Sequence, residues 1–226
     1  MYGQCFVRFL HIYFVRNRKV AAHMGLVSSM HRNPHGGNFF KDLLLTSSLD
    51  WTVKLWNTNA SSFKEPLMEL VAPSYDYVCG VQWSPVHASL FSTITSGGVL
   101  TLWDLSKSTL EAQDSFNIFK DQPGIGGGEE GLAALNKLVW SVDGLSLYVG
   151  DTRGSIRQIA VKEACARSRP GDEGRAELAL MARAKNSITG TLEMEVNGDV
   201  DTKPSSIFGV NNQSMDAVGD ENVSDR

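Results

Sequence analysis

The chain has 226 residues, enough for one sizeable domain or for one domain and a tail. Hydrophobic residues make up 42% of the sequence and charged residues 20%, as in ordinary globular proteins. The formal net charge is only -4, and neither end of the chain is dense in one charge. We therefore expect neither nucleic acid nor insertion into a membrane.

The cysteines and the start of the chain favour the cytosol. Cys5, Cys79 and Cys165 are far apart and odd in number, which argues against both a disulfide framework and a C-x-x-C metal site. The apolar run at residues 9–15 is far too short to span a bilayer. The opening also lacks the basic segment and the cleavage site of a signal peptide.

Short β-type runs separated by turn residues begin soon after residue 23. A strand is predicted at residues 43–48, followed by a turn at Leu49-Asp50. Residues 51–56 then alternate as W-T-V-K-L-W, the period of two that is typical of a half-buried strand.

The same layout recurs twice, with strands predicted at residues 77–84, 90–95 and 99–105, and again at residues 135–141, 145–150 and 155–161. Trp56 and Trp103 are 47 residues apart, whereas Trp83 and Trp140 are 57 apart because a Gly-rich insertion occupies residues 121–132. Repeats of roughly 40 to 45 residues, each with several short strands and a W-D signature, are typical of propeller blades. The predicted fold is therefore all-β, a partial β-propeller with blades at about 23–72, 73–120 and 133–161.

The chain changes character after residue 161. Residues 162–185 are predicted to form a helical extension, whose main helix begins at Asp172 as a capping residue. Its apolar face is expected to consist of Leu178, Met181 and Ala182. Residues 186–226 are polar and acidic, and are predicted to form a disordered tail.

The first repeat carries a specific family resemblance. Residues 46–56 read T-S-S-L-D-W-T-V-K-L-W, and in this stretch the chain resembles the dynein intermediate chains, which are WD-repeat proteins. Further matches are Tyr77-Val78, residues 81–85, residues 102–105, residues 134–137, Trp140 and residues 149–151. The resemblance covers about residues 23–184, and residues 39–56 look closer to the cytoplasmic type. It leaves the N-terminal segment 1–22 and the tail unmatched.

The resemblance implies a polar set that ties the strands of a blade together. In the first repeat this set is His23, Ser48, Asp50 and Trp56, with Thr52 beside it. A buried carboxylate needs donors, and imidazole, hydroxyl and indole groups supply them. A hydrolase using His23, Ser48 and Asp50 is the alternative, although no nucleophile elbow surrounds Ser48.

The later repeats depart from this set. The second keeps Trp103-Asp104 but has Gly97 where Asp50 stood, with Asp76 or Tyr77 near the position of the His. The third has Ile159 in place of the Trp. These departures put the polar set in doubt for the second and third blades, but not the fold.

Two other patterns are poor candidates for sites. The Gly-rich residues 124–128 lack the Lys and the Ser or Thr of a P-loop, and Glu129-Glu130 would repel phosphate. His31 and His35 flank a proline, with no carboxylate or Cys beside them, so a metal site is not expected there. We expect no cofactor, no metal and no catalytic residue.

The resemblance further implies a non-catalytic subunit of a dynein motor complex. Such a subunit would bind the dynein heavy chain and support cargo attachment in microtubule-based transport, in the cytoplasm and on the cytoskeleton. Contacts with dynein light chains and dynactin are implied only for a longer N-terminal form. A generic WD-repeat scaffold in a ubiquitin ligase or a ciliary transport particle is the alternative. A second alternative is an axonemal intermediate chain in a cilium.

The loops of a propeller present residues to partners. Candidate partner-binding residues are Trp51, Lys54, Tyr75, Tyr77 and Arg153. Three repeats cannot close a propeller. We therefore expect the chain to be a fragment, with its missing blades upstream of His23.

Overall fold

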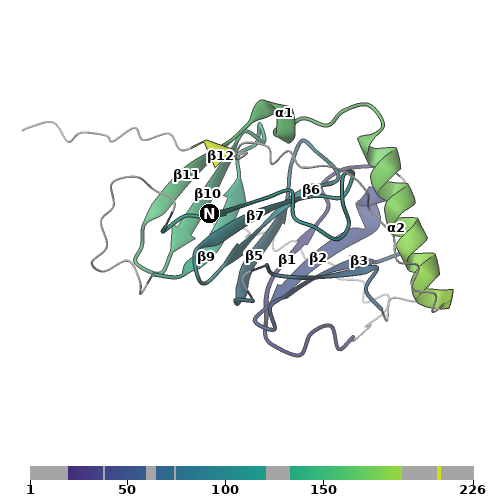
Figure 1. Cartoon of the computed structure of the whole chain (residues 1–226), viewed down its shortest axis with the longest axis horizontal. Coiled ribbons are helices and arrows are strands. Elements are labelled where there is room, and N and C mark those ends of the chain that lie inside the picture. Colours follow the sequence, from purple (N-terminus) through teal and green to yellow (C-terminus); the bar gives the residue numbers. More distant parts are fainter. Residues whose placement is uncertain are drawn as a thin grey trace, which may run out of the picture.

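The computed structural model describes residues 20–37, 39–59, 65–73, 75–120, 133–189 and 208–209. Within these residues the fold consists of three four-stranded antiparallel sheets, two helices and a short 3-10 turn (Figure 1). The N-terminal residues 1–19, the Gly-rich insertion 121–132 and most of the predicted tail lie outside the described residues.

The first two sheets are blades formed by consecutive strands. Blade 1 contains β1 (Val27–Arg32), β2 (Leu43–Ser48), β3 (Thr52–Asn57) and β4 (Met68–Val71), with the 3-10 turn η1 (Phe40–Asp42) before β2. Blade 2 contains β5 (Val78–Trp83), β6 (Leu90–Thr95), β7 (Val99–Asp104) and β8 (Asp114–Asn117). Each blade is thus a four-stranded meander, the repeating unit of a β-propeller.

Blade 3 differs in the source of its last strand. It contains β9 (Leu135–Trp140), β10 (Ser146–Asp151) and β11 (Ile156–Val161). Its fourth strand is β12 (Phe208–Gly209), which pairs with Ala160 and Val161 of β11. These two residues fall in the stretch predicted to be a disordered tail. Their pairing covers backbone groups of β11 that would otherwise form an open sheet edge.

The blades lie side by side through their first strands. β5 contacts β1 on one side and β9 on the other, and Figure 1 shows the three strands together in the middle of the molecule. One apolar cluster joins Leu45 and Leu55 of blade 1 to Trp83 and Phe91 of blade 2. A second cluster joins the opposite face of blade 2 to blade 3, with Leu102 among its members. The core therefore lies between blades.

A repeated hydrogen bond also links neighbouring blades. The backbone N–H of Trp83 in β5 donates to Nδ1 of His31 in β1, at 3.1 Å. The backbone N–H of Trp140 in β9 donates in the same way to Oε1 of Gln82 in β5, at 3.0 Å. His31 and Gln82 each stand fifth in the first strand of their blade, and that position in blade 3 is Val139, which cannot accept such a bond.

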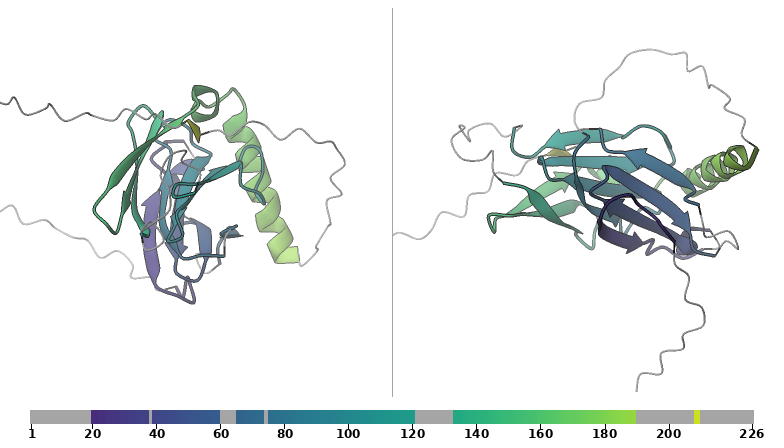
Figure 2. Two further views of the ribbon diagram at one scale, coloured as in Figure 1. Left: turned by 60° about the vertical axis from the view of Figure 1, so that its left-hand side comes forward. Right: turned by 90° about the horizontal axis from the view of Figure 1, so that it is seen from below.

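Two helices follow β11. They are α1 (Glu163–Ala166) and α2 (Asp172–Thr189), so α2 runs four residues past the predicted end of the helical extension. α2 lies against the outside of the sheets (Figure 1 and Figure 2), and Ala176 and Leu180 join the cluster between blades 1 and 2. The apolar face predicted for this helix is wrong, because Leu178, Met181 and Ala182 are exposed.

Candidate functional site

A network of polar side chains connects the start of blade 1 to its β2–β3 hairpin. Nδ1 of His23 lies 3.0 Å from Oδ2 of Asp50 and 3.0 Å from the hydroxyl of Thr52. The backbone N–H groups of Met24 and Thr52 also donate to the Asp50 carboxylate. This network ties the segment before β1 to the turn between β2 and β3.

The hydroxyl that continues the network belongs to Thr46. It lies 2.8 Å from Nε2 of His23 and accepts a hydrogen bond of 2.9 Å from the indole N–H of Trp56. Ser48, which the sequence placed in this set, has a different role: its hydroxyl accepts a hydrogen bond from the backbone N–H of Asp50. Thr46 and Ser48 lie on the same face of β2, and of the two it is Thr46 that the indole of Trp56 reaches, diagonally across from β3.

The electrostatics of Asp50 suit a fixed structural anion. Burial alone would raise the pKa of Asp50, but hydrogen bonds from Thr52 and Met24, together with nearby His23, hold this pKa well below its usual range. The carboxylate therefore stays ionised over the whole physiological range and keeps its donors oriented.

The order Asp50, His23, Thr46 resembles the acid, base and hydroxyl of a hydrolase, but its setting differs. The His23 side chain is fully buried, and the Trp56 indole occupies the other side of the Thr46 hydroxyl. A catalytic hydroxyl needs room for a substrate carbonyl beside it. The Ser48 hydroxyl makes no hydrogen bond to His23, so the alternative built on His23, Ser48 and Asp50 lacks its first contact.

Blade 2 keeps half of this network. The indole N–H of Trp103 donates to the hydroxyl of Thr93 at 3.1 Å, as Trp56 does to Thr46. Asp76 reaches the β6–β7 turn and accepts hydrogen bonds from Ser96 and the backbone N–H of Gly97. Asp76, rather than Tyr77, thus stands at the position of the His, and it supplies the carboxylate that Gly97 cannot.

Blade 3 replaces the same pair with apolar side chains. By strand register, Val149 stands where Thr46 does and Ile159 stands where Trp56 does, and both are buried. An apolar pair needs no hydrogen-bond partner, so blade 3 holds its strands without the polar set.

Three of the candidate partner-binding residues form an exposed aromatic surface at one end of blade 1. Trp51 is 46% exposed, Tyr75 is 73% exposed and Tyr77 is 51% exposed. Trp51 lies in the β2–β3 turn, and the other two lie between β4 and β5. The backbone joins these segments, because the N–H of Ala72 donates to the carbonyl of Trp51 and the N–H of Tyr75 donates to the carbonyl of Ala72. We call Trp51, Tyr75 and Tyr77 the aromatic surface.

The backbone of this surface is unusual. Among the described residues, Trp51 and Tyr75 are the two non-glycine residues with positive φ, at 70° and 47°. At the position of Trp51 in blade 2 stands Gly98, which adopts φ 91° without steric cost. Bulky residues held at positive φ are typical of positions where function, rather than local stability, sets the residue.

The two basic candidates are placed differently. Lys54 faces Glu69 on the neighbouring strand β4, and its Nζ lies 3.1 Å from the carboxylate of Glu69. Its side chain is only 15% exposed, so Lys54 has little surface to offer a partner. Arg153 is exposed in the β10–β11 turn, at the corresponding end of blade 3.

The remaining polar candidates do not converge on a ligand. His31 bonds to the backbone of Trp83 and His35 to the carbonyl of Ser84, so each joins blade 1 to blade 2. Within the described part of the chain, no group of three His, Cys, Asp or Glu side chains could hold a metal ion. No helix in that part is long and apolar enough to cross a membrane.

The four-stranded meanders, the first strands side by side and the His–Asp–Thr–Trp network together define a WD-repeat protein with part of a β-propeller. The chain is 34% identical over 149 residues to the cytoplasmic dynein 1 intermediate chain of Drosophila melanogaster, which confirms its resemblance to the dynein intermediate chains. This match covers 65% of the chain but only 20% of the relative.

Two further comparisons add little. No established family profile matches the chain. Among solved structures, the WD40 domain of Toxoplasma gondii coronin is similar with a TM-score of 0.49 and 18% identity, over 62% of this chain and 32% of that one.

Proposed function

We propose that the chain is a non-catalytic WD-repeat subunit of a dynein motor complex, and that it binds the dynein heavy chain through the aromatic surface. The similarity to a dynein intermediate chain supports the assignment to this complex. The observation that carries the binding role is the pair of exposed aromatic residues, Trp51 and Tyr75, held at positive φ.

The chemistry of the aromatic surface suits a protein partner. Large aromatic side chains on a rigid scaffold bury much area at a low cost in conformational entropy, and they dominate the binding free energy of many interfaces. Arg153 is the basic residue that we include in the binding role. Only the aliphatic part of the Lys54 side chain contributes to the binding role, because the charge of Lys54 is already paired with Glu69.

In this proposal the protein acts in the cytoplasm, associated with microtubules, and helps to attach cargo to the motor. Light-chain and dynactin contacts belong to a longer form with additional N-terminal sequence. A location in the cilium would follow if the heavy chain it binds were axonemal.

The test is recovery of the heavy-chain tail by the tagged chain. Trp51→Asn removes the aromatic ring while tolerating positive φ, and should weaken recovery by about tenfold or more, as expected for an interface hot spot. Tyr148→Ala is the matched control, because Tyr148 is 39% exposed on blade 3, away from the aromatic surface. Arg153→Glu should weaken recovery by a smaller factor.

Two results would contradict the proposal. If the unaltered chain recovers no heavy chain, the assignment to a dynein complex fails, and a WD-repeat scaffold of another assembly becomes the better account. If Trp51→Asn and Tyr148→Ala recover equal amounts, the chain binds through some other surface.

A further inference from the structure

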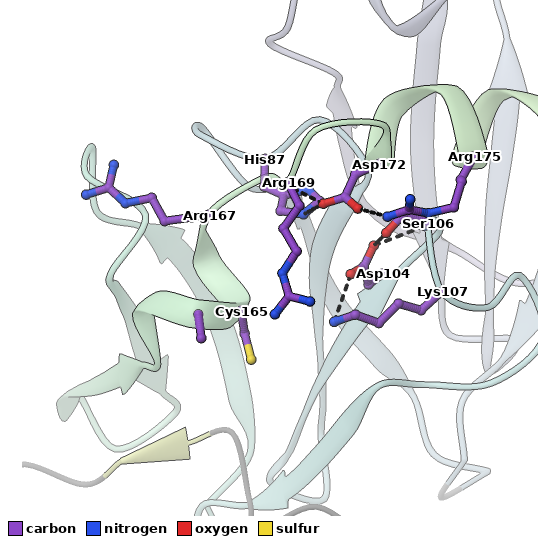
Figure 3. A pocket seen from close by; sticks show the side chains of 10 residues that line it. His87, Asp104, Ser106, Lys107, Cys165, Arg167, Arg169, Asp172 and Arg175 are labelled. Carbon is purple, nitrogen blue, oxygen red and sulfur yellow. Dashed lines mark hydrogen bonds and ion pairs between the residues drawn. The ribbon is translucent and has the colours of Figure 1, made fainter.

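A cavity of about 190 Å³ opens between blade 2 and the two C-terminal helices. His87 from the β5–β6 connection and Asp104 from the end of β7 line one wall. Cys165 of α1, Arg169 and Asp172 line the other (Figure 3). The cavity thus lies between segments that are far apart in the sequence.

Two buried carboxylates form the floor of the cavity, and each has both hydrogen-bond donors and a cationic partner. Asp104 accepts hydrogen bonds from Ser89 and from the hydroxyl and backbone N–H of Ser106, and its Oδ2 lies 3.2 Å from Nζ of Lys107. Burial would raise the pKa of Asp104, but the hydrogen bonds from Ser106, together with nearby His87 and Lys107, outweigh it and lower this pKa, so the group is ionised.

Asp172 also has both hydrogen-bond donors and a cationic partner. It accepts a hydrogen bond of 2.6 Å from the backbone N–H of Arg169, and it pairs with the guanidinium of Arg175. Nε2 of His87 lies 3.4 Å away. Neither carboxylate therefore needs a cation from solution.

The cavity still carries excess positive charge. Four cationic residues line it against these two carboxylates: Lys107, Arg167, Arg169 and Arg175. Lys107 and Arg175 pair with the carboxylates, and Arg167 pairs at 3.4 Å with Glu163 outside the cavity. The Arg169 guanidinium has no hydrogen bond or ion pair to any described residue, and Figure 3 shows it extending into the same space as Lys107.

Size and charge limit what can bind here. A water molecule takes about 30 Å³ of liquid, and pockets for drug-sized ligands begin at about 300 Å³, so this cavity suits one small anion. Once the pair of Arg167 with Glu163 is counted, the four lining cations exceed the carboxylates that pair with them by one charge, that of Arg169. The Arg169 guanidinium can bind two phosphate oxygens and leave further oxygens for Lys107, whereas it would use both oxygens of a carboxylate.

We propose that this cavity binds a single phosphate group, held by Arg169 and Lys107 above the buried floor of Asp104 and Asp172. The phosphate can be free inorganic phosphate or the side chain of a phosphorylated residue, since both present the same dianion. The site is independent of the aromatic surface and of any heavy-chain binding.

Calorimetric titration of the full chain tests the proposal with two probes, inorganic phosphate and N-acetyl-phosphoserine amide, at constant ionic strength. We expect saturable one-to-one binding of at least one probe. Arg169→Gln should weaken it by about tenfold or more, as expected for loss of a charge-assisted hydrogen bond. Lys137→Gln is the matched control, because it removes the same charge from an exposed side chain of β9 outside the cavity, and it should bind as the unaltered chain does.

The titrations distinguish a site for free phosphate, a site for a phosphorylated residue and the absence of a site. Binding of both probes with equal affinity supports a free-phosphate site, and preference for phosphoserine supports a phosphorylated ligand. Absence of saturable binding to either probe overturns the proposal. Equal weakening by Arg169→Gln and Lys137→Gln also overturns it, because the attraction would then be general. The Arg169 side chain has no partner among the described residues, so its loss should leave the fold intact, and unchanged circular dichroism would confirm this.

Discussion

Thr46 is the residue on which the polar network of blade 1 depends. Its hydroxyl contacts both the imidazole of His23, in the segment before β1, and the indole of Trp56, in β3. Loss of this hydroxyl would leave two buried polar groups without a partner, and each such loss costs about 1–3 kcal/mol. In blade 2 the hydroxyl of Thr93 serves one group, the indole of Trp103.

We therefore predict that Thr46→Val, which preserves shape, lowers the free energy of unfolding by about 2–4 kcal/mol. Thr93→Val should lower it by about 1–2 kcal/mol, since one bond is lost rather than two. Urea denaturation of both variants measures the difference. Equal losses, or a larger loss for Thr93→Val, would contradict the role given to Thr46.

The sequence predicted three members of this network but missed the fourth. His23, Asp50 and Trp56 stand at the spacings of the repeat, whereas Thr46 and Ser48 are chemically alike and lie on the same face of β2. A signal for Thr46 was available. In both blade 1 and blade 2 a threonine lies ten residues before the strand-closing tryptophan and accepts its indole hydrogen bond.

His31 predicts a pH dependence. Burial lowers the pKa of His31 from 6.5, and its Nδ1 accepts the N–H of Trp83 and so carries no proton. A histidine with a depressed folded pKa contributes stability that is present above the unfolded pKa and is lost as the pH falls below about 6.5. Protonation of Nδ1 would break the bond between blades 1 and 2.

We predict that the unaltered chain loses stability between about pH 7 and about pH 5.5, and that His31→Asn flattens this loss. Asparagine can offer an oxygen near the position of Nδ1 and does not titrate. His87, whose pKa burial also lowers, keeps part of the slope in both proteins. Denaturation at several pH values gives the slopes, and identical slopes would show that His31 titrates in the folded state as it does in the unfolded chain.

The strands that the sequence missed show what a hydrophobic pattern can detect. The predicted strands lie at or near β2, β3, β5, β6, β7, β9, β10 and β11, which carry apolar alternation or apolar runs. The outer strands β4 (M-E-L-V) and β8 (D-S-F-N) have four residues each, and β1 (V-S-S-M-H-R) is mostly polar. Such segments become strands because a neighbouring strand offers its hydrogen bonds, and this information is not local.

The helix α2 was predicted in place but with the wrong face. Alternative apolar stripes compete on it, because leucines stand at both 178 and 180. The position of the helix against blades 1 and 2 decides between them, since Leu180 is fully buried and Leu178 is 70% exposed. That position depends on the path of the chain after blade 3, and the helical periodicity of the sequence does not determine this path.

These two leucines give an internally controlled prediction. Leu180→Ala should lower the free energy of unfolding by about 2–5 kcal/mol, because it opens a cavity in the cluster between blades 1 and 2. Leu178→Ala should change it by less than about 0.5 kcal/mol. Similar values for the two variants in urea denaturation would mean that α2 does not pack on the sheets through Leu180.

At the scale of the whole molecule, the three blades differ in the faces that they present to the next blade. The face of blade 1 that meets blade 2 includes Leu55, and the equivalent residue of blade 2, Leu102, packs against blade 3. By strand register the equivalent residue of blade 3 is Gln158, which is exposed and whose amide bonds to Ser146. This face also lacks the hydrogen-bond acceptor that His31 and Gln82 supply, since Val139 takes their place. Blade 3 therefore presents a face chemically unlike those that hold blades together.

Reciprocal substitutions at equivalent positions test this difference. Leu102→Gln should lower the free energy of unfolding by about 3–5 kcal/mol, because it removes buried apolar area and places an unpaired amide between blades 2 and 3. Gln158→Leu should change it by less than about 0.5 kcal/mol, because a leucine there stays in water. The two variants can be compared in one series of urea denaturations. A gain of more than about 1 kcal/mol for Gln158→Leu would mean that this face of blade 3 is covered, since only burial makes the added apolar area stabilising.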